Sequence, residues 1–258
     1  MSSFRDRLKT GQPQFGCLIT YPLPGVIERI GSDWDWFWLD GQHGQLGYQD
    51  LLALVRACDL VGRASFVRVP GHDAGTIGMA LDTGATGVIV PQVHSADQAR
   101  AVVQAAKFPP LGDRSFGGRR AVDLHGRGYA ATANDDTILI VQVESPEGLA
   151  AVDEIAAVPG VDCVHLGPDD LMLRRGHPMD QPHPRDVVAG DLDAVVGACR
   201  RHGKLSAAMG VSREMCDACV SLGVNLIASA LDVGFIAAGS ADASRQARQI
   251  AQNSKHSK

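Results

Sequence analysis

Residues 138–167, ILIVQVESPEGLAAVDEIAAVPGVDCVHLG, contain two short apolar runs separated by a helical pattern. The runs ILIVQVES (138–145) and VDCVHLG (161–167) have the length and the β-branched content of buried parallel strands. Between them, EGLAAVDEIAAV (147–158) repeats apolar residues at three- and four-residue spacing, which is typical of an amphipathic helix. This stretch therefore predicts a strand–helix–strand unit.

Six further apolar runs recur along the chain, and helical patterns lie between them. The runs predict strands at residues 15–21, 34–40, 64–70, 87–93, 204–210 and 225–231, with helices that include 48–62, 96–108 and 191–203. Eight such units predict an α/β protein with a closed (β/α)8 TIM barrel. A doubly wound open sheet is the alternative, but no G-x-G-x-x-G follows the first strand. We expect a single barrel domain over residues 1–258, with its core at about 15–253.

Two long stretches rich in glycine, proline and polar residues, 108–136 and 174–190, interrupt this rhythm and predict loops. Long loops in compact enzymes serve as lids or subunit contacts, and surface decoration is the other interpretation. The C-terminal sequence NSKHSK (253–258) is expected to fray.

The composition is that of an ordinary soluble globular protein. Of the 258 residues, 45% are hydrophobic, and the formal net charge is −5. The basic residues are scattered, so we expect no nucleic-acid partner. The N-terminal MSSFRDRLKTGQPQ lacks the apolar core of a signal peptide, and no stretch approaches the ~20 apolar residues of a membrane span. We therefore expect no membrane partner and a cytoplasmic location.

The cysteines lack the spacing of a disulfide scaffold, which suits buried thiols in a reducing compartment. They are Cys17, Cys58, Cys163, Cys199, Cys216 and Cys219. Cys216 and Cys219 form a C-x-x-C within a helical pattern, but no second pair completes a zinc site. We predict a packing role for them.

Polar residues gather where the predicted strands end, which in a (β/α)8 barrel is the face that carries the chemistry. They are Asp40 and His43, Arg68, Gln142 and Glu144, and Asp169 and Asp170. Each has a structural alternative: the arginine could pair with a carboxylate, the acids could cap helices, and the histidine could be structural. Their joint placement favours a functional site, since charged side chains in a strand-rich core need partners or a bound ion.

Two carboxylates on adjacent strand ends, with no cysteine ligand nearby, suit an oxygen-ligated Mg²⁺ or Mn²⁺. A 2-oxo acid could chelate that metal, which as a Lewis acid would stabilise the enolate formed when the adjacent carbon–carbon bond breaks. Arg68 would add a fixed positive charge, and His43 is the natural proton carrier.

A Schiff-base aldolase would instead need a buried lysine on a strand. Of the five lysines, Lys204 stands at the start of the seventh predicted strand and would face the wrong end of the barrel. The metal-dependent route is therefore preferred.

The chain resembles the HpcH/HpaI aldolase family, the class II pyruvate-dependent aldolases that include 4-hydroxy-2-oxoheptanedioate and 2-dehydro-3-deoxyglucarate aldolases. The resemblance spans roughly residues 15–235 and follows the family's order of motifs. These are DWFWLDGQHG, VRVP, LDTGATGVIVPQV, FPPLGDRS, VQVESPEGL with DEIAAVPGVD, and LGPDDL.

The resemblance implies reversible aldol cleavage of a 4-hydroxy-2-oxo acid to pyruvate, or a close 2-oxo acid, plus an aldehyde. It implies His43 as catalytic acid/base, Arg68 as transition-state stabiliser and Asp82 as the carboxylate that raises the basicity of the histidine. The cofactor would be Mg²⁺, Mn²⁺ or Co²⁺ on Glu144 and Asp170. The residues implied to position the pyruvate moiety are Gln142, Gly167, Pro168 and Asp169.

The resemblance further implies a homotrimer or homohexamer with an exchanged C-terminal helix, in which Asp82 would serve a neighbouring subunit's site. The chain departs from the family at Leu18, Gln42 and Ser115–Phe116, where many members have Trp, Glu and Gly-Val. These departures leave the identity of the aldehyde open. A CoA-thioester lyase, a 2-oxo-diacid decarboxylase and a non-catalytic acid-binding barrel remain alternatives.

Overall fold

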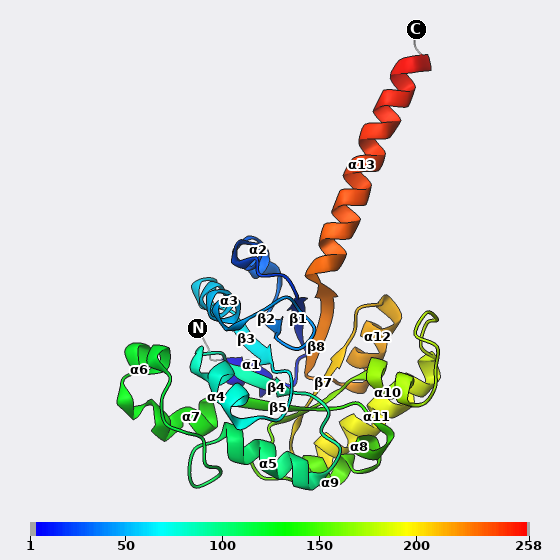
Figure 1. Cartoon of the computed structure of the whole chain (residues 1–258). Helices are drawn as coiled ribbons and strands as arrows, with labels where there is room; N and C mark the ends of the chain where they lie inside the picture. Colours follow the sequence, from blue (N-terminus) through cyan, green and yellow to red (C-terminus); the bar gives the residue numbers. More distant parts are fainter. Residues whose placement is uncertain (1–3, 257–258) are drawn as a thin grey trace.

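The computed structural model describes residues 4–256, with side chains described through Asn253, and its strands form one closed parallel barrel (Figure 1). The strands are β1 Gln14–Ile19, β2 Trp36–Asp40, β3 Ala64–Arg68, β4 Gly87–Val90, β5 Ile138–Val143, β6 Cys163–Leu166, β7 Leu205–Met209 and β8 Leu226–Leu231. Each strand pairs with the next in chain order, and β8 closes the barrel on β1. All eight predicted strands are confirmed, and the protein is a (β/α)8 barrel.

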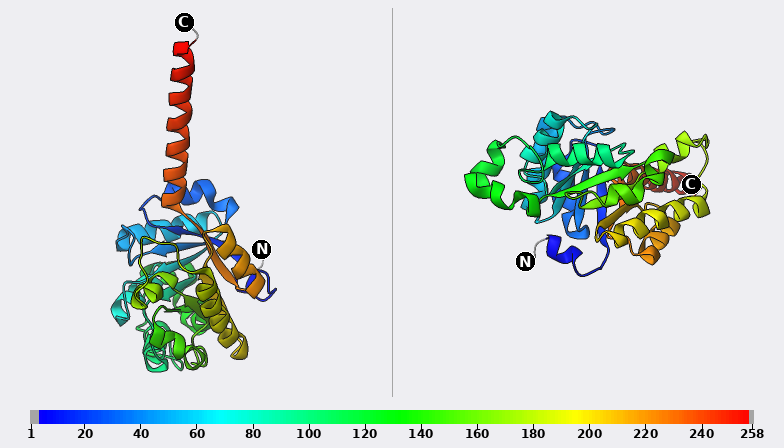
Figure 2. Two further views of the ribbon diagram at one scale, coloured as in Figure 1. Left: turned by 90° about the vertical axis from the view of Figure 1, so that its right-hand side faces the viewer. Right: turned by 90° about the horizontal axis from the view of Figure 1, so that it is seen from below.

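Helices surround the barrel between successive strands (Figures 1 and 2). They are α1 Phe4–Leu8, α2 Pro24–Ile30, α3 Tyr48–Leu60, α4 Ala74–Asp82, α5 Ala96–Ala106, α6 Arg119–His125, α7 Ala130–Asp136, α8 Pro146–Ala150, α9 Val152–Ala156, α10 Pro168–Arg174, α11 Arg185–Arg201, α12 Arg213–Leu222 and α13 Asp232–His256. The helix predicted at 147–158 is divided into α8 and α9 at Ala151. The cysteines are free thiols, and Cys216 and Cys219 lie within α12 as predicted.

The loop predicted over residues 108–136 is wrong in part, because α6 and α7 occupy much of it. Its aromatic residues pack together, although the sequence of this stretch has no helical periodicity: the Phe116 and Tyr129 rings stack with centroids 5.7 Å apart. The Tyr129 hydroxyl also donates a hydrogen bond to the Gly117 carbonyl at 2.7 Å. The second predicted loop, 174–190, is likewise too long, since α11 begins at Arg185 and buries Val188.

The inside of the barrel is a packed core, as the alternation of side chains along each strand requires. Inward-facing residues from several strands form one buried cluster. Its members include Leu18, Trp36, Trp38, Phe66, Ile89, Ile140, Ala207 and Leu226. Outward-facing residues such as Val141 and Val164 join a second cluster with helix residues such as Leu192. The polar residues at the strand ends therefore lie above a filled interior.

The amino-terminal end of the barrel is closed by α1 and a buried charge cluster. Leu8 joins the interior cluster, and the Phe4 ring lies 5.8 Å from that of Phe66. Lys107 is buried and donates to Asp162 at 2.8 Å, and Arg5 donates to the same carboxylate at 3.0 Å. Burial lowers the pKa of Lys107, although the charge of Asp162 opposes this shift.

Lys204 belongs to the same end of the barrel, as predicted. Its Nζ donates to the Val161 carbonyl at 2.8 Å, just before β6 begins. This lysine is therefore bound at the end opposite the strand C-termini and is unable to form an imine there.

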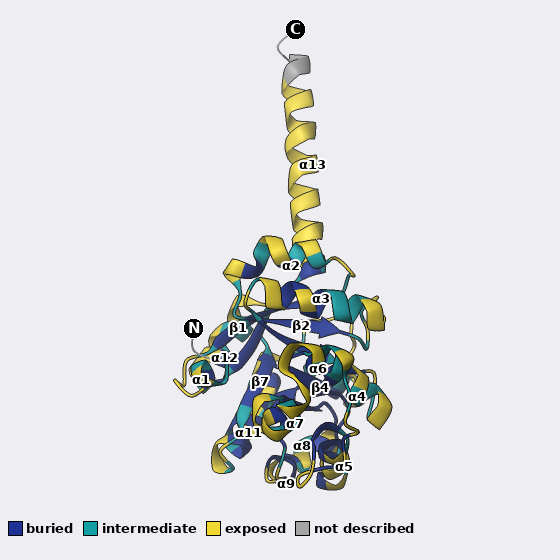
Figure 3. Ribbon diagram, turned by 90° about the vertical axis from the view of Figure 1, so that its left-hand side faces the viewer, coloured by how far each residue is buried: buried dark blue, intermediate teal, exposed yellow. Residues whose placement is uncertain are grey.

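Helix α13 leaves the barrel after β8 and projects away from it (Figures 1 and 2). Its base is fixed by Asp232, whose carboxylate accepts hydrogen bonds from the Thr20 and Tyr21 backbone N–H groups at 2.8 and 2.9 Å. Beyond Val233 its described residues are exposed (Figure 3). The tail predicted to fray from Asn253 is helical through His256, and residues 257–258 lie outside the described residues. In the described part of the chain, no helix is both long and apolar enough to cross a bilayer.

Candidate active site

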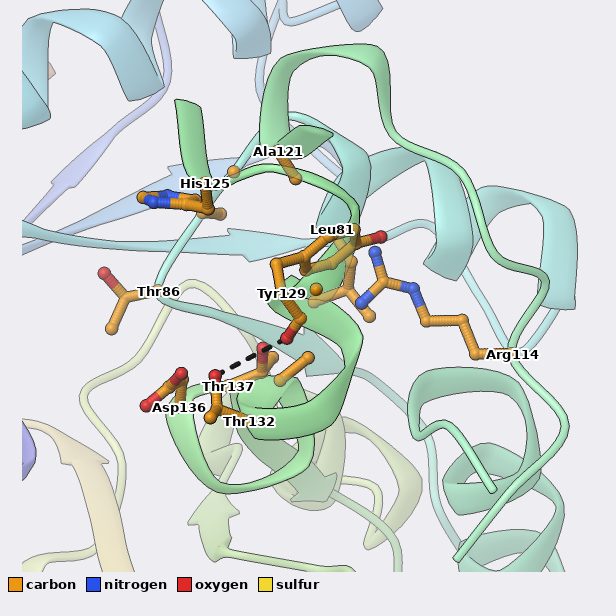
Figure 4. A pocket seen from close by; sticks show the side chains of 13 residues that line it. Leu81, Thr86, Arg114, Ala121, His125, Tyr129, Thr132, Asp136 and Thr137 are labelled. Atoms are coloured by element: carbon orange, nitrogen blue, oxygen red, sulfur yellow. Dashed lines mark hydrogen bonds between the residues drawn. The ribbon is translucent and has the colours of Figure 1, made fainter. Parts of the chain in front are cut away.

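A cavity of about 290 Å³ lies at the C-terminal ends of the strands and contains most of the predicted site residues. Its lining includes Thr20, Trp38, Asp40, His43, Arg68, Gln142, Glu144, His165, Gly167, Pro168, Asp169 and Asp170. A larger cavity of about 550 Å³ lies beside α6 and α7 and is lined by residues that include Arg114, His125 and Tyr129 (Figure 4). It contains none of the predicted site residues, so the chemistry favours the smaller cavity.

Arg68 is held at the mouth by Asp40. The two residues are register partners at the ends of β3 and β2. Arg68 donates from Nε to Asp40 Oδ1 at 2.9 Å and from Nη2 to Oδ2 at 2.7 Å, which is a bidentate pair. Burial would raise the pKa of Asp40, but the hydrogen bonds and charge of Arg68, with two backbone N–H groups, outweigh it and lower that pKa. The guanidinium is therefore fixed in position.

His43 lies in the turn after β2, where Asp40 also organises the backbone. The N–H groups of Gln42 and His43 donate to Asp40 Oδ1 at 3.1 and 3.2 Å. The imidazole is exposed at the cavity and forms no hydrogen bond with any described side chain or backbone group. Its nitrogens are thus free to exchange a proton with a bound molecule.

Glu144 follows β5 and is buried in the cavity wall. Its Oε1 accepts the Gln92 backbone N–H at 2.8 Å, and its Oε2 accepts a hydrogen bond from Gln142 Nε2. Gln92 has a φ of 56°, in the left-handed region that non-glycine residues rarely occupy. Burial raises the pKa of Glu144; the Gln142 hydrogen bond lowers it, and the charge of Asp170 raises it.

Asp170 stands in the first turn of α10 and faces the same cavity. Its charge acts on Glu144, so two carboxylates repel each other in a partly buried space. A divalent cation would relieve that repulsion, and both side chains offer the oxygen ligands that Mg²⁺ or Mn²⁺ prefers. The described residues contain no group of three or more His, Cys, Asp or Glu arranged to hold a metal. The pair therefore fits a cation that leaves coordination positions for a substrate.

The segment from β6 into α10 provides the remaining predicted residues. Gly167, Pro168 and Asp169 all line the cavity. The Asp169 carboxylate is largely exposed, and its Oδ1 lies 2.7 Å from His183 Nε2 in the loop before α11. The side chain of Asp169 therefore points to the His183 loop, while the residue still lines the cavity.

Asp82 is the one predicted site residue outside this cavity. It ends α4, where its Oδ1 accepts a hydrogen bond from Arg114 Nη2 at 2.8 Å. It lines a different surface cavity, with His72 and Ser115. Within this chain Asp82 and His43 therefore line separate cavities.

The structure adds cavity residues that were assigned no role from the sequence, chiefly Trp38 and His165. Their rings meet edge to face, with centroids 4.9 Å apart, and the Arg68 guanidinium lies 5.0 Å from the Trp38 ring centre. The available signal was a histidine within the apolar run VDCVHLG, two residues before Gly167, and therefore on the same inward-facing side of the strand.

The sequence pattern of the HpcH/HpaI aldolase/citrate lyase family matches residues 26–238. The chain belongs to this family. A 2-dehydro-3,6-dideoxy-6-sulfogluconate aldolase from Pseudomonas putida is 35% identical over 232 residues, which are 89% of this chain and 90% of the relative. A 4-hydroxy-2-oxovalerate aldolase from Novosphingobium aromaticivorans is 38% identical over 179 residues, 68% of each chain.

Solved structures agree with this assignment. An HpcH/HpaI aldolase/citrate lyase family protein from Burkholderia cenocepacia superimposes with a TM-score of 0.85 at 29% identity, over 95% of this chain and 98% of that one. The HpcH/HpaI member described here is therefore an enzyme of the pyruvate-type aldolase class. The alternative of a non-catalytic barrel has no support.

Proposed function

We propose that this enzyme catalyses the reversible aldol cleavage of a 4-hydroxy-2-oxo acid to pyruvate, or a close 2-oxo acid, plus an aldehyde. The observation that carries the proposal is the meeting of two carboxylates, Glu144 and Asp170, with Arg68 and His43 in one cavity. The names of the relatives, which are aldolases of 2-oxo acids, support the same reaction class.

Glu144 and Asp170 are the residues that would hold the divalent cation, which we propose to be Mg²⁺, Mn²⁺ or Co²⁺. Once bound, this cation supplies electrophilic stabilisation of the negative charge that develops on the 2-oxo group. Gln142 and the backbone of Gly167–Asp169 position the acid against the wall of the cavity. Arg68, fixed by Asp40, adds a second positive charge for the same oxygen.

His43 performs the proton transfer. Its imidazole takes the proton of the C4 hydroxyl, the C3–C4 bond breaks, and the aldehyde leaves with its new carbonyl group. C3 then gains one proton, which balances the proton that His43 accepted, and the 2-oxo acid is formed. In the synthetic direction, His43 returns the proton to the alkoxide that forms when the aldehyde carbon is attacked.

Asp82 is proposed to act on the site of a neighbouring subunit, in a homotrimer or homohexamer. In its own subunit it lies on a surface cavity outside the mouth, which supports an intersubunit role. The exposed helix α13 supports an assembly in which this helix packs against another copy.

The proposal is tested by pyruvate release from a panel of 4-hydroxy-2-oxo acids, before and after removal of divalent cations with a chelator. We expect chelation to abolish release and Mg²⁺, Mn²⁺ or Co²⁺ to restore it. Glu144→Gln and Asp170→Asn should bind the cation more weakly while keeping the circular dichroism spectrum of the fold, because amides are poorer ligands of similar shape.

His43→Ala should lower turnover by about 10²- to 10⁴-fold, the range for a general acid/base. His125→Ala is the matched control, since His125 is exposed on α6 and does not line the cavity. Full activity in excess chelator would contradict the role of the cation. Unchanged turnover in the His43 variant would contradict the proton transfer.

A further inference from the structure

Three side chains at the floor of the active-site cavity keep polar atoms without hydrogen-bond partners in the described structure. They are Trp38 on β2, Gln142 on β5 and His165 on β6, and each is at most 2% exposed. The unpaired atoms are Trp38 Nε1, Gln142 Oε1 and both ring nitrogens of His165. Gln142 and His165 are register partners on adjacent strands, and the His165 ring lies against Trp38.

Such a floor is costly for the protein alone. A buried polar group without a partner loses about 1–3 kcal/mol relative to its hydrated state. Apolar side chains such as Phe66, Ile89 and Ala207 fill other parts of the barrel interior without this cost. The polar atoms therefore point to a ligand that supplies the missing hydrogen bonds.

The pairing capacity of the floor defines the chemical group that it can bind. Burial, followed by the charge of Arg68, lowers the pKa of His165 to about 3, so the ring is neutral and has one donor and one acceptor nitrogen. The Trp38 indole only donates, and Gln142 Oε1 only accepts. A hydroxyl group can donate one hydrogen bond to one of the two acceptors and can accept from the donors, whereas a methyl group does neither and a carboxylate only accepts.

We propose that the floor binds a hydroxyl group on C3 of the 2-oxo acid, so that this aldolase prefers a 3-hydroxy-2-oxo acid, such as hydroxypyruvate, to pyruvate. This inference rests on the proposed function, in which the carboxylate and oxo groups of the acid occupy the charged rim. The carbon chain of the acid is then the part that reaches the floor.

The reaction balances without any other reactant. C3 of hydroxypyruvate loses a proton and forms a bond with the aldehyde carbon, and the aldehyde oxygen gains a proton. The C3 hydroxyl is unchanged, and the product is a 3,4-dihydroxy-2-oxo acid. The cleavage direction reverses these steps.

The test compares kcat/KM for hydroxypyruvate and pyruvate with one acceptor, glyceraldehyde, in the Mn²⁺-loaded enzyme. We expect hydroxypyruvate to be favoured by roughly 10-fold or more in the wild type, since a site built to bind a hydroxyl discriminates against its absence. His165→Phe keeps a planar ring without nitrogens. It should lower kcat/KM for hydroxypyruvate by about 10- to 100-fold, and by more than it lowers kcat/KM for pyruvate.

Two further variants separate hydrogen bonding from packing. His165→Asn retains a donor and an acceptor and should keep more of the preference than His165→Phe does. His125→Phe makes the same exchange at an exposed position outside the cavity and should leave the preference unchanged. If His165→Phe does not fold, as judged by circular dichroism, the comparison rests on His165→Asn, whose preference should lie below that of the wild type.

Equal use of both acids by the wild type, or an undiminished preference in the His165 variants, would overturn the inference while leaving the aldolase function intact. Turnover of neither acid would instead contradict the proposed function. In that case, calorimetric titration of the Mn²⁺-loaded protein with each acid tests the inference without turnover. Tighter binding of hydroxypyruvate than of pyruvate, reduced in the His165 variants, supports the hydroxyl site, and equal binding refutes it.

Discussion

Arg68 meets two different partners in the same fixed position. Its guanidinium forms two parallel hydrogen bonds with Asp40, and it lies 5.0 Å from the centre of the Trp38 ring. A planar, delocalised cation can make both contacts, whereas the point charge of a lysine lacks the two-pronged geometry. Arg68→Lys would therefore keep the charge and lose its orientation.

Asp40→Asn should lower the free energy of unfolding by about 1.5–3 kcal/mol at pH 7, because hydrogen bonds to a charged partner are lost inside the mouth. The lowered pKa of Asp40 sets the pH dependence. A carboxylate with a lowered folded-state pKa stabilises the fold above its unfolded pKa of about 3.9, and this contribution disappears as the pH falls through the folded value. Urea denaturation from pH 3 to pH 7 should thus show that the unfolding free energies of the wild type and Asp40→Asn approach each other as the pH falls.

The control for this prediction is Asp123→Asn, which removes the carboxylate of an exposed pair with Arg119. Exposed pairs contribute little, so the change should stay below about 1 kcal/mol. If the loss of unfolding free energy in Asp40→Asn remained constant down to pH 3, the charge of Asp40 would not be the cause of that loss.

All eight predicted site residues other than Asp82 line the cavity. Strand ends and charge were enough to predict Arg68, Glu144 and Asp170, and His43 follows from the adjacent turn. Asp82 stands apart, on a different surface cavity. His165 was missed because one histidine in an apolar run is also compatible with a core position. Its unpaired nitrogens become visible only when the packing around the ring is known.

At the scale of elements, the strands were predictable because parallel strands buried on both faces are nearly continuous apolar runs. Short helices such as α6 and α7 were not, since seven residues give too little periodicity among glycines and charged side chains. The left-handed backbone at Gln92, which directs its N–H at Glu144, also had no sequence signal.

The junction between β6 and α10 depends on the absence of a side chain at Gly167. A Cβ added there would lie 2.6 Å from Glu144 Oε2 and 2.8 Å from Gln142 Nε2. Gly167→Ala should therefore displace the Glu144 carboxylate and weaken cation binding by about 10- to 100-fold, the range for residues that orient metal ligands. Calorimetric titration with Mn²⁺ measures this change.

Gly190→Ala is the matched control within α11, where an added Cβ meets nothing within 4 Å. It should leave Mn²⁺ affinity unchanged and stabilise the helix by about 0.5–1 kcal/mol. If Gly167→Ala bound Mn²⁺ with wild-type affinity, the cavity wall would have room for the added methyl group, contrary to the geometry.

At the scale of the whole molecule, α13 is the element with least support from its own barrel. Its contact with the barrel is at its base, where the Phe235 and Trp34 rings lie 6.2 Å apart, while Ile236 and Ile250 are exposed. Apolar residues on a projecting helix are typical of a surface that another subunit covers.

We expect the intact chain to form a homo-oligomer in solution and the double variant Ile236→Glu/Ile250→Glu to have a lower mass, because charges oppose burial of this helix face. Leu60→Glu on α3 is the control, since Leu60 is 73% exposed but lies on the barrel. Size-exclusion chromatography with light scattering measures the masses. A monomeric wild type at micromolar concentration would refute the assembly.

The closed amino-terminal end of the barrel also determines the order of events in catalysis. With α1 and the Lys107–Asp162 cluster below and a packed interior between, molecules reach the floor only through the mouth. In the proposed arrangement, the 2-oxo acid lies deeper than the aldehyde, so it enters first in synthesis and departs last in cleavage. The kinetics should therefore be ordered, with the 2-oxo acid as the leading substrate, and product-inhibition patterns would record that sequence. Because the barrel is sealed at one end, the two substrates bind and leave in a fixed order.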